Sequence, residues 1–111
     1  ARVLIMGFTF KENCPDLRNT RVIDVVKELS EFGCKVDVTD CWADNEEAEH
    51  EYGITLNQNP EKTQYDALLL AVPHREYVAR SSHNLREYMK DNGVLFDLKG
   101  VLPLGEADLR L

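Results

Sequence analysis

Arg2-Val3-Leu4-Ile5-Met6-Gly7 is the segment most informative about the fold, because its pattern predicts a buried strand that runs directly into a glycine. A run that is apolar throughout, without alternation, is typical of a parallel strand covered on both faces. Residues 66–72 predict a second strand of this strongly buried kind, and residues 93–97 predict the last strand. Residues 35–40 alternate apolar and polar side chains, which predicts a strand nearer an edge of the sheet. Residues 53–56 predict a further short strand.

Helical segments are predicted between these strands. One apolar helix stripe with three- and four-residue spacing is formed by Val22, Val25, Val26, Leu29 and Phe32. We expect Asn19 or Thr20 to cap the start of this helix and Gly33 to end it. The acidic residues 43–51 predict a short surface helix, and helical material is expected over roughly residues 74–90, ahead of an irregular tail marked by Pro103 and Gly105.

Strands that alternate with helices predict an α/β fold. We expect a doubly wound, mostly parallel sheet of the Rossmann-like kind, with helices on both faces. The chain has 111 residues, 43% of them hydrophobic, which is enough for one core, so residues 1–111 are expected to form a single domain. Because the first residue already belongs to a strand, we expect this domain to be cut from a larger protein.

Composition and charge exclude several classes of function. The formal net charge is -7, so sequence-independent electrostatic binding of nucleic acid is not expected. No apolar run approaches the roughly 18 residues of a membrane span. The odd set Cys14, Cys34 and Cys41 forms no CxxC pair, which favours a cytoplasmic protein over a secreted one. The three histidines share no metal-type spacing with these cysteines, so no metal site is expected.

One end of the sheet is predicted to be basic. Residues 1–21 hold four basic and two acidic residues in an otherwise acidic chain. Loops that leave the carboxyl ends of parallel strands should bring Lys11, Arg18, Arg75 and Lys99 to one rim, where they would suit phosphate or diphosphate. Chance clustering of charge would give the same count. The GxGxxG fingerprint is absent, since Gly7 stands alone in the first turn, so a self-contained NAD site is not expected.

The loop after the first strand carries the most informative motif. Phe10-Lys11, followed by Asp16-Leu17-Arg18 and a small polar residue, closely resembles the signature that opens the C-terminal domain of the UDP-glucose/GDP-mannose dehydrogenase family. Residues 66–74 and 96–99 are similar to later segments of that domain, so the resemblance covers essentially the whole chain. The sequence of residues 12–18 is most similar to that of bacterial members that act on UDP-N-acetylhexosamines.

This resemblance implies an activity for a larger protein. Enzymes of the family oxidise the C6 alcohol of a nucleotide sugar to a carboxylate in two NAD-dependent steps, here in bacterial surface polysaccharide biosynthesis. NAD lies mainly on an N-terminal domain, a cysteine nucleophile sits between that domain and the C-terminal one, and the C-terminal domain closes over the UDP half of the substrate. The chain alone is then expected to be inactive, and its partners would be the UDP-sugar, the N-terminal and central domains, and further copies in a homo-oligomer. The alternative is a standalone Rossmann-like regulatory or interaction module without catalysis.

The same resemblance implies roles for individual residues. Phe10 and Lys11 match the family's substrate-contacting pair, and Lys99 occupies the position of a basic substrate contact after the last strand. Arg18 matches the arginine that reaches toward the cofactor, and Asp16 matches an aspartate expected to brace the loop.

The predicted loops at this edge also contain a cysteine and a histidine, Cys14 and His74. Cys14 is expected to pack structurally, because the family nucleophile belongs to a glycine-rich segment that this chain lacks. His74 follows a strand and a proline and is a supporting residue that could face the ligand cleft.

Overall fold

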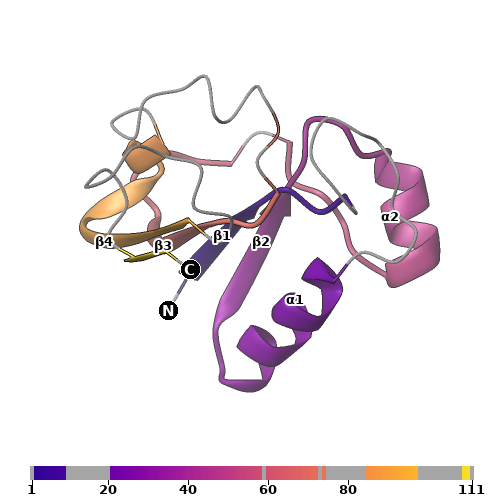
Figure 1. Ribbon diagram of the computed structural model, residues 1–111, viewed down its shortest axis with the longest axis horizontal. Coiled ribbons are helices and arrows are strands. Elements are labelled where there is room, and N and C mark those ends of the chain that lie inside the picture. Colours follow the sequence, from indigo (N-terminus) through magenta and orange to yellow (C-terminus); the bar gives the residue numbers. More distant parts are fainter. Residues whose placement is uncertain are drawn as a thin grey trace.

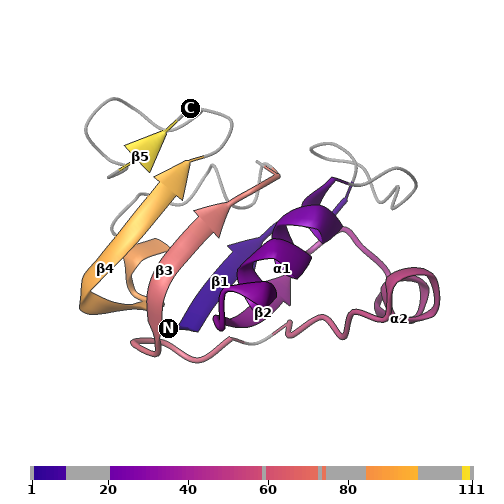
Figure 2. The same cartoon turned by 90° about the horizontal axis from the view of Figure 1, so that it is seen from below.

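A computed structural model describes residues 2–9, 21–58, 60–72, 74, 85–97 and 109–110 (Figure 1). The elements are β1 (Arg2–Met6), α1 (Val22–Glu31), β2 (Lys35–Thr39), α2 (Asn45–Tyr52), β3 (Tyr65–Leu70), β4 (Met89–Asp97) and β5 (Leu109–Arg110). The strands form one sheet in the order β2-β1-β3-β4-β5, and every pairing is parallel (Figure 2). The predicted doubly wound α/β sheet is therefore confirmed.

The two faces of the sheet bury separate apolar clusters. Val3 and Ile5 point toward α1, which lies across β1 and β2 (Figure 2), and pack there with Val26. Leu4 and Met6 point to the opposite face, where helical residues 85–86 contribute the fully buried Leu85. Alternate side chains of a strand point to opposite faces, so the continuous apolar run of β1 needs cover on both sides. Helix α1 supplies this cover on one face, and on the other the described helical cover is residues 85–86, since residues 75–84 of the predicted helix lie outside the described residues.

Three details of the elements differ from the sequence prediction. Residues 53–56 are not a strand: Ile54 and Leu56 pack against the cluster beneath α1, but their backbone is not paired as a strand. The predicted helix cannot extend to residue 90, because β4 begins at Met89. Residues 93–97 are not the last strand, since β5 follows in the predicted irregular tail. Residues 90–92 are exposed and polar, so no apolar pattern marked the start of β4.

The ends of α1 follow the sequence only in part. Arg21 is its N-cap, with no side-chain hydrogen bond; the predicted caps Asn19 and Thr20 lie outside the described residues. Gly33 follows the helix with a φ of 85°, the left-handed conformation predicted for it. Phe32 was predicted to extend the buried stripe but is 79% exposed, because it lies beyond the last helical residue.

Gly7 brings the carboxyl ends of three strands together. Its φ is 100°, and a Cβ atom there would lie 2.5 Å from Cβ of Val72, which follows β3. The Gly7 amide also donates to the carbonyl of Thr39 at the end of β2, at 2.8 Å. Glycine is required here by both the conformation and the close approach. The turn after β1 consequently lies against the ends of β2 and β3.

A polar network ties the amino ends of the same strands. The Tyr65 hydroxyl donates to Oδ2 of Asp37 at 2.7 Å, and the Arg2 guanidinium lies 5.0 Å from the centroid of the Tyr65 ring. Burial of Tyr65 and its hydrogen bond to Asp37 raise the pKa of the phenol to about 12. These contacts join β1, β2 and β3 at the end of the sheet opposite Gly7.

Within the described ranges, no helix has the length and apolar character needed to cross a membrane.

Candidate functional site

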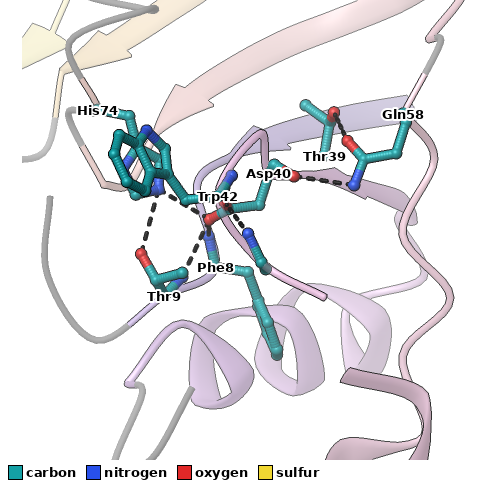
Figure 3. A network of polar contacts seen from close by, with 8 residues as sticks. Phe8, Thr9, Thr39, Asp40, Trp42, Gln58 and His74 are labelled. Atoms are coloured by element: carbon teal, nitrogen blue, oxygen red, sulfur yellow. Dashed lines mark hydrogen bonds and ion pairs between the residues drawn. The ribbon is translucent and has the colours of Figure 1, made fainter. Parts of the chain in front are cut away.

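The carboxyl edge between β1 and β3 is the expected ligand position. The chain leaves β1 for β2 on one side of it and returns to β3 on the other, so the strand order reverses at this point. Open α/β sheets bind their ligands outside the carboxyl ends of the strands at such a switch point. In this structure, the described residues at that edge form a polar network centred on Asp40 (Figure 3).

One oxygen of the Asp40 carboxylate joins all three strand ends. Asp40 directly follows β2, and its Oδ2 accepts the backbone N–H groups of Phe8 at 2.5 Å and Thr9 at 3.1 Å, both after β1. The same oxygen lies 2.9 Å from Nε2 of His74, which follows β3. A single buried oxygen thus connects the residues that follow β1 and β3 to the residue that follows β2.

The other carboxylate oxygen orders the turn that follows. Oδ1 of Asp40 accepts the backbone N–H groups of Trp42 at 2.7 Å and Ala43 at 2.9 Å. This Asx-type turn is a common use of aspartate at the end of a strand. On the outer side, Nε2 of Gln58 donates to the carbonyl oxygen of Asp40 at 2.8 Å. Both carboxylate oxygens are therefore occupied by contacts within the chain.

The electrostatics of Asp40 favour its charged form. Burial alone would raise the pKa of this fully buried carboxyl, because desolvation penalises the charge. The hydrogen bonds from His74 and from the amides of Phe8 and Trp42 outweigh that effect and leave the pKa below 3.8. Asp40 is thus a charged acceptor for five donors near neutral pH, an arrangement suited to holding loops in place and unsuited to proton transfer.

The structure brings His74 to the predicted edge but places it below the surface. His74 is fully buried, and its Nε2 lies 3.1 Å from Oγ1 of Thr9 as well as beside Asp40. The half-buried Trp42 indole stacks on the imidazole, with ring centroids 6.0 Å apart and planes inclined by 26°. The described contacts of His74 therefore point into the network, and its part in ligand binding stays a prediction.

The other predicted site residues are Phe10, Lys11, Asp16, Arg18 and Lys99, and all of them lie outside the described residues. Cys14 and Arg75 lie outside them as well. Thr9, the last described residue of its segment, directly precedes Phe10 and Lys11 in the sequence. The network is thus joined through the chain to the segment that carries the motif.

Sequence reasoning missed the central residue of this network. Asp40 was treated as the end of a strand, although a carboxylate directly after a predicted parallel strand falls at the edge where ligands bind. That position was the available signal. Among the residues that the structure describes, no group of three or more histidine, cysteine or carboxylate side chains is placed to hold a metal ion.

An apolar hollow elsewhere does not compete as a nucleotide site. Its volume is about 370 Å³, and it lies between α1 and the strands β3 and β4. Its lining consists of Val3, Val25, Leu29, Ala67, Leu68, Leu69, Val94 and Phe96. None of these side chains can donate a hydrogen bond to a phosphate.

Known proteins resemble this chain along nearly its whole length. It is 53% identical over 109 residues to a UDP-N-acetyl-D-glucosamine 6-dehydrogenase of Salmonella typhi and 52% identical over 111 residues to one of Pseudomonas aeruginosa. These alignments include 98% and 100% of the chain but 26% of each relative, so the chain spans about a quarter of their length.

A solved structure shares the fold. The UDP-N-acetyl-mannosamine dehydrogenase of Staphylococcus aureus superposes with a TM-score of 0.74 over 98% of this chain and 25% of that protein, at 18% identity. Residues 4–103 match a domain described as the UDP binding domain of the UDP-glucose/GDP-mannose dehydrogenase family, and this range includes the motif region, part of β1 and the whole of β2, β3 and β4. The chain belongs to the UDP-glucose/GDP-mannose dehydrogenase family.

Proposed function

We propose that this chain is the UDP-sugar-binding domain of an NAD-dependent UDP-sugar 6-dehydrogenase. The observation that carries the proposal is the 53% identity, over 98% of the chain, to a relative named UDP-N-acetyl-D-glucosamine 6-dehydrogenase. The complete enzyme oxidises the C6 alcohol of a UDP-N-acetylhexosamine to a carboxylate, in the biosynthesis of a bacterial surface polysaccharide. It acts in the cytoplasm, as a homo-oligomer.

Individual residues of the chain have separate roles in binding the UDP-sugar and the cofactor. Lys11 and Lys99 neutralise the diphosphate as mobile point charges, and Phe10 packs near the sugar or the uracil. Arg18 reaches toward the cofactor, and Asp16 braces the loop. This division is supported by the strand order, which reverses beside β1, because open α/β sheets bind ligands at the carboxyl edge of such a point and Phe10 is four residues beyond the last residue of β1, Met6.

NAD is held mainly by the N-terminal domain, and when bound it accepts the hydride from C6. The first turn of this chain contains Gly7 alone, where a self-contained dinucleotide site uses three glycines for close approach to the pyrophosphate. Hydride transfer therefore requires the domains outside this chain, and the chain by itself binds a UDP-sugar weakly and turns nothing over.

The test uses the full-length polypeptide that contains this chain. UDP-N-acetylhexosamines are supplied with NAD, and formation of reduced NAD is followed by its absorbance. Lys11→Ala should lower kcat/KM by roughly ten- to a hundredfold, the effect of losing one charge-assisted hydrogen bond. Arg75→Ala, the matched loss of a positive charge, should have a smaller effect.

Two results would contradict the proposal at different levels. A folded full-length protein that oxidises no UDP-sugar in the presence of NAD removes the dehydrogenase function. An active enzyme whose Lys11→Ala variant stays within about threefold of wild type removes only the substrate contact of Lys11, since that ratio is well under 1 kcal/mol.

A further inference from the structure

The sheet carries a polar network at each end of strands β1, β2 and β3. At the amino end of the sheet, Arg2, Asp37 and Tyr65 already tie β1, β2 and β3 together. The Asp40 network ties the same three strands at the end where ligands bind. The contacts of Asp40 Oδ2 fall on the two segments, after β1 and after β3, that flank the switch point (Figure 3).

We infer that Asp40 and His74 are positioning residues for UDP-sugar binding. Asp40 holds the backbone N–H groups of Phe8 and Thr9, and so fixes the direction in which the chain leaves β1 toward Phe10 and Lys11. His74 holds the same carboxylate oxygen from the β3 side. The inference rests on the proposed function, and neither residue touches substrate, since both side chains are fully buried.

The distances explain why the pair acts as a unit. Three donors, from Phe8, Thr9 and His74, converge on Oδ2 of Asp40 within 3.1 Å. Loss of the donor on His74 frees the carboxylate to rotate or shift, and the two amides after β1 then lose their common anchor. A displacement of about 1 Å in a substrate-positioning group can cost as much as a hundredfold in rate.

The chemistry of glutamine provides the control for His74. The amide nitrogen of His74→Gln can still donate to Oδ2 of Asp40, whereas His74→Leu removes the donor and leaves an apolar side chain of similar size. A positioning role predicts that the two variants differ in substrate binding. Loss of packing alone predicts that they behave alike.

A second control separates binding from stability. Tyr65→Phe removes the hydroxyl that donates to Asp37 at 2.7 Å, so it deletes one partly buried, charge-assisted hydrogen bond at the opposite end of the sheet. It should lower the unfolding temperature of the domain without changing the residues near the ligand. Any kinetic effect of destabilisation in general would appear in this variant as well.

The experiment measures KM for the UDP-sugar and kcat in the full-length enzyme at saturating NAD. His74→Leu should raise KM about tenfold with kcat changed by less than about threefold, the pattern of lost ground-state binding. His74→Gln should recover KM to within about threefold of wild type, and Tyr65→Phe should leave it unchanged. Thr9→Val, which removes the hydroxyl 3.1 Å from His74 Nε2, should raise KM about threefold and provides the test if His74→Leu does not fold.

An active enzyme in which His74→Leu and Thr9→Val keep the wild-type KM overturns the inference alone. Equal increases in KM for His74→Leu and His74→Gln also overturn it, because packing would then account for both. A full-length wild-type enzyme that oxidises no UDP-sugar overturns the proposed function, and this inference with it.

Discussion

His74 Nε2 lies 2.9 Å from Oδ2 of Asp40, although the two residues are 34 positions apart in the chain and both side chains are fully buried. Asp40 follows β2 and His74 follows β3, and these strands are separated in the sheet by β1. The contact therefore reaches across the carboxyl end of β1. This explains why the exit of β1, with Phe8 and Thr9, is enclosed between the ends of its two neighbours.

Asp40→Asn should destabilise the chain by about 2–4 kcal/mol at neutral pH. One carboxylate oxygen becomes an NH2 group, so either the amides of Phe8 and Thr9 or those of Trp42 and Ala43 lose their acceptor. Urea unfolding of the 111-residue chain, followed through its single tryptophan, measures the difference. A loss below about 0.5 kcal/mol, the range of an ordinary surface substitution, would contradict the network's role.

The effect of Asp40→Asn should also depend on pH. The folded pKa of Asp40 lies below its usual value of 3.8, so the unfolded chain binds the proton first as the pH falls. The stability that the carboxylate contributes is present above pH 3.8 and is lost as the pH falls through the folded pKa. The difference in free energy of unfolding between wild type and Asp40→Asn should therefore decrease below pH 3.8. A difference that stays constant there would be evidence against the lowered pKa of Asp40.

Gly7→Ala should cost about 3 kcal/mol or more, whereas Gly33→Ala should cost about 1–2 kcal/mol. Both glycines have positive φ, at 100° and 85°, which is unfavourable for alanine. A Cβ at Gly7 would also lie 2.5 Å from Cβ of Val72, but one at Gly33 would meet no atom within 4 Å. Unfolding of the two variants under the same conditions isolates the steric part. Equal losses would show that Val72 moves aside.

The sequence was sufficient to predict the sheet because its signals are local. The apolar runs of β1 and β3 required burial on both faces, and the helix stripe with Gly33 at its end predicted α1. The prediction of strand boundaries failed where pairing with a distant strand, and no local sequence pattern, determines the strand. Residues 90–92 are polar and exposed, yet β4 begins at Met89, where it pairs with Tyr65 at the start of β3.

The position of the candidate site at the sheet edge could be predicted from the sequence, but the contact between Asp40 and His74 could not. The histidine after β3 was expected at the carboxyl edge, from the rule for parallel strands, whereas the same rule was not applied to the carboxylate after β2. Their contact depends on the spatial order β2-β1-β3, which places the ends of β2 and β3 on either side of β1. Strand order is a property of the assembled sheet, and no local feature of Asp40 or His74 encodes it.

Val26→Ala, within α1, should destabilise the chain by about 1.5–3 kcal/mol, whereas Phe32→Ser, just beyond the helix, should change the free energy of unfolding by less than about 0.5 kcal/mol. Val26 is 8% exposed and packs in the cluster beneath the helix, whereas Phe32 is 79% exposed beyond its end. Urea unfolding of both variants measures the contrast. A loss of more than about 1 kcal/mol for Phe32→Ser would mean that Phe32 is covered in solution.

The stabilising contribution of Tyr65 should disappear in alkali. Its folded pKa of about 12 exceeds the usual value of 10.0, because burial and the hydrogen bond to Asp37 disfavour the phenolate. The unfolded chain therefore releases this proton first as the pH rises. The contribution is complete below pH 10.0 and falls between there and about pH 12.

Tyr65→Phe tests this dependence directly. The variant loses the hydrogen bond to Asp37. A hydrogen bond to a charged acceptor contributes about 1.5–3 kcal/mol to the free energy of unfolding, so the variant should be less stable than wild type at neutral pH. Because phenylalanine has no proton to release, the difference should shrink as the pH rises above 10.0. Unfolding at a series of pH values, with tyrosinate followed by ultraviolet absorbance, gives both quantities. A difference that stays constant up to pH 12 would show that Tyr65 ionises equally easily in the folded and unfolded chain, and that its hydroxyl is not held by Asp37.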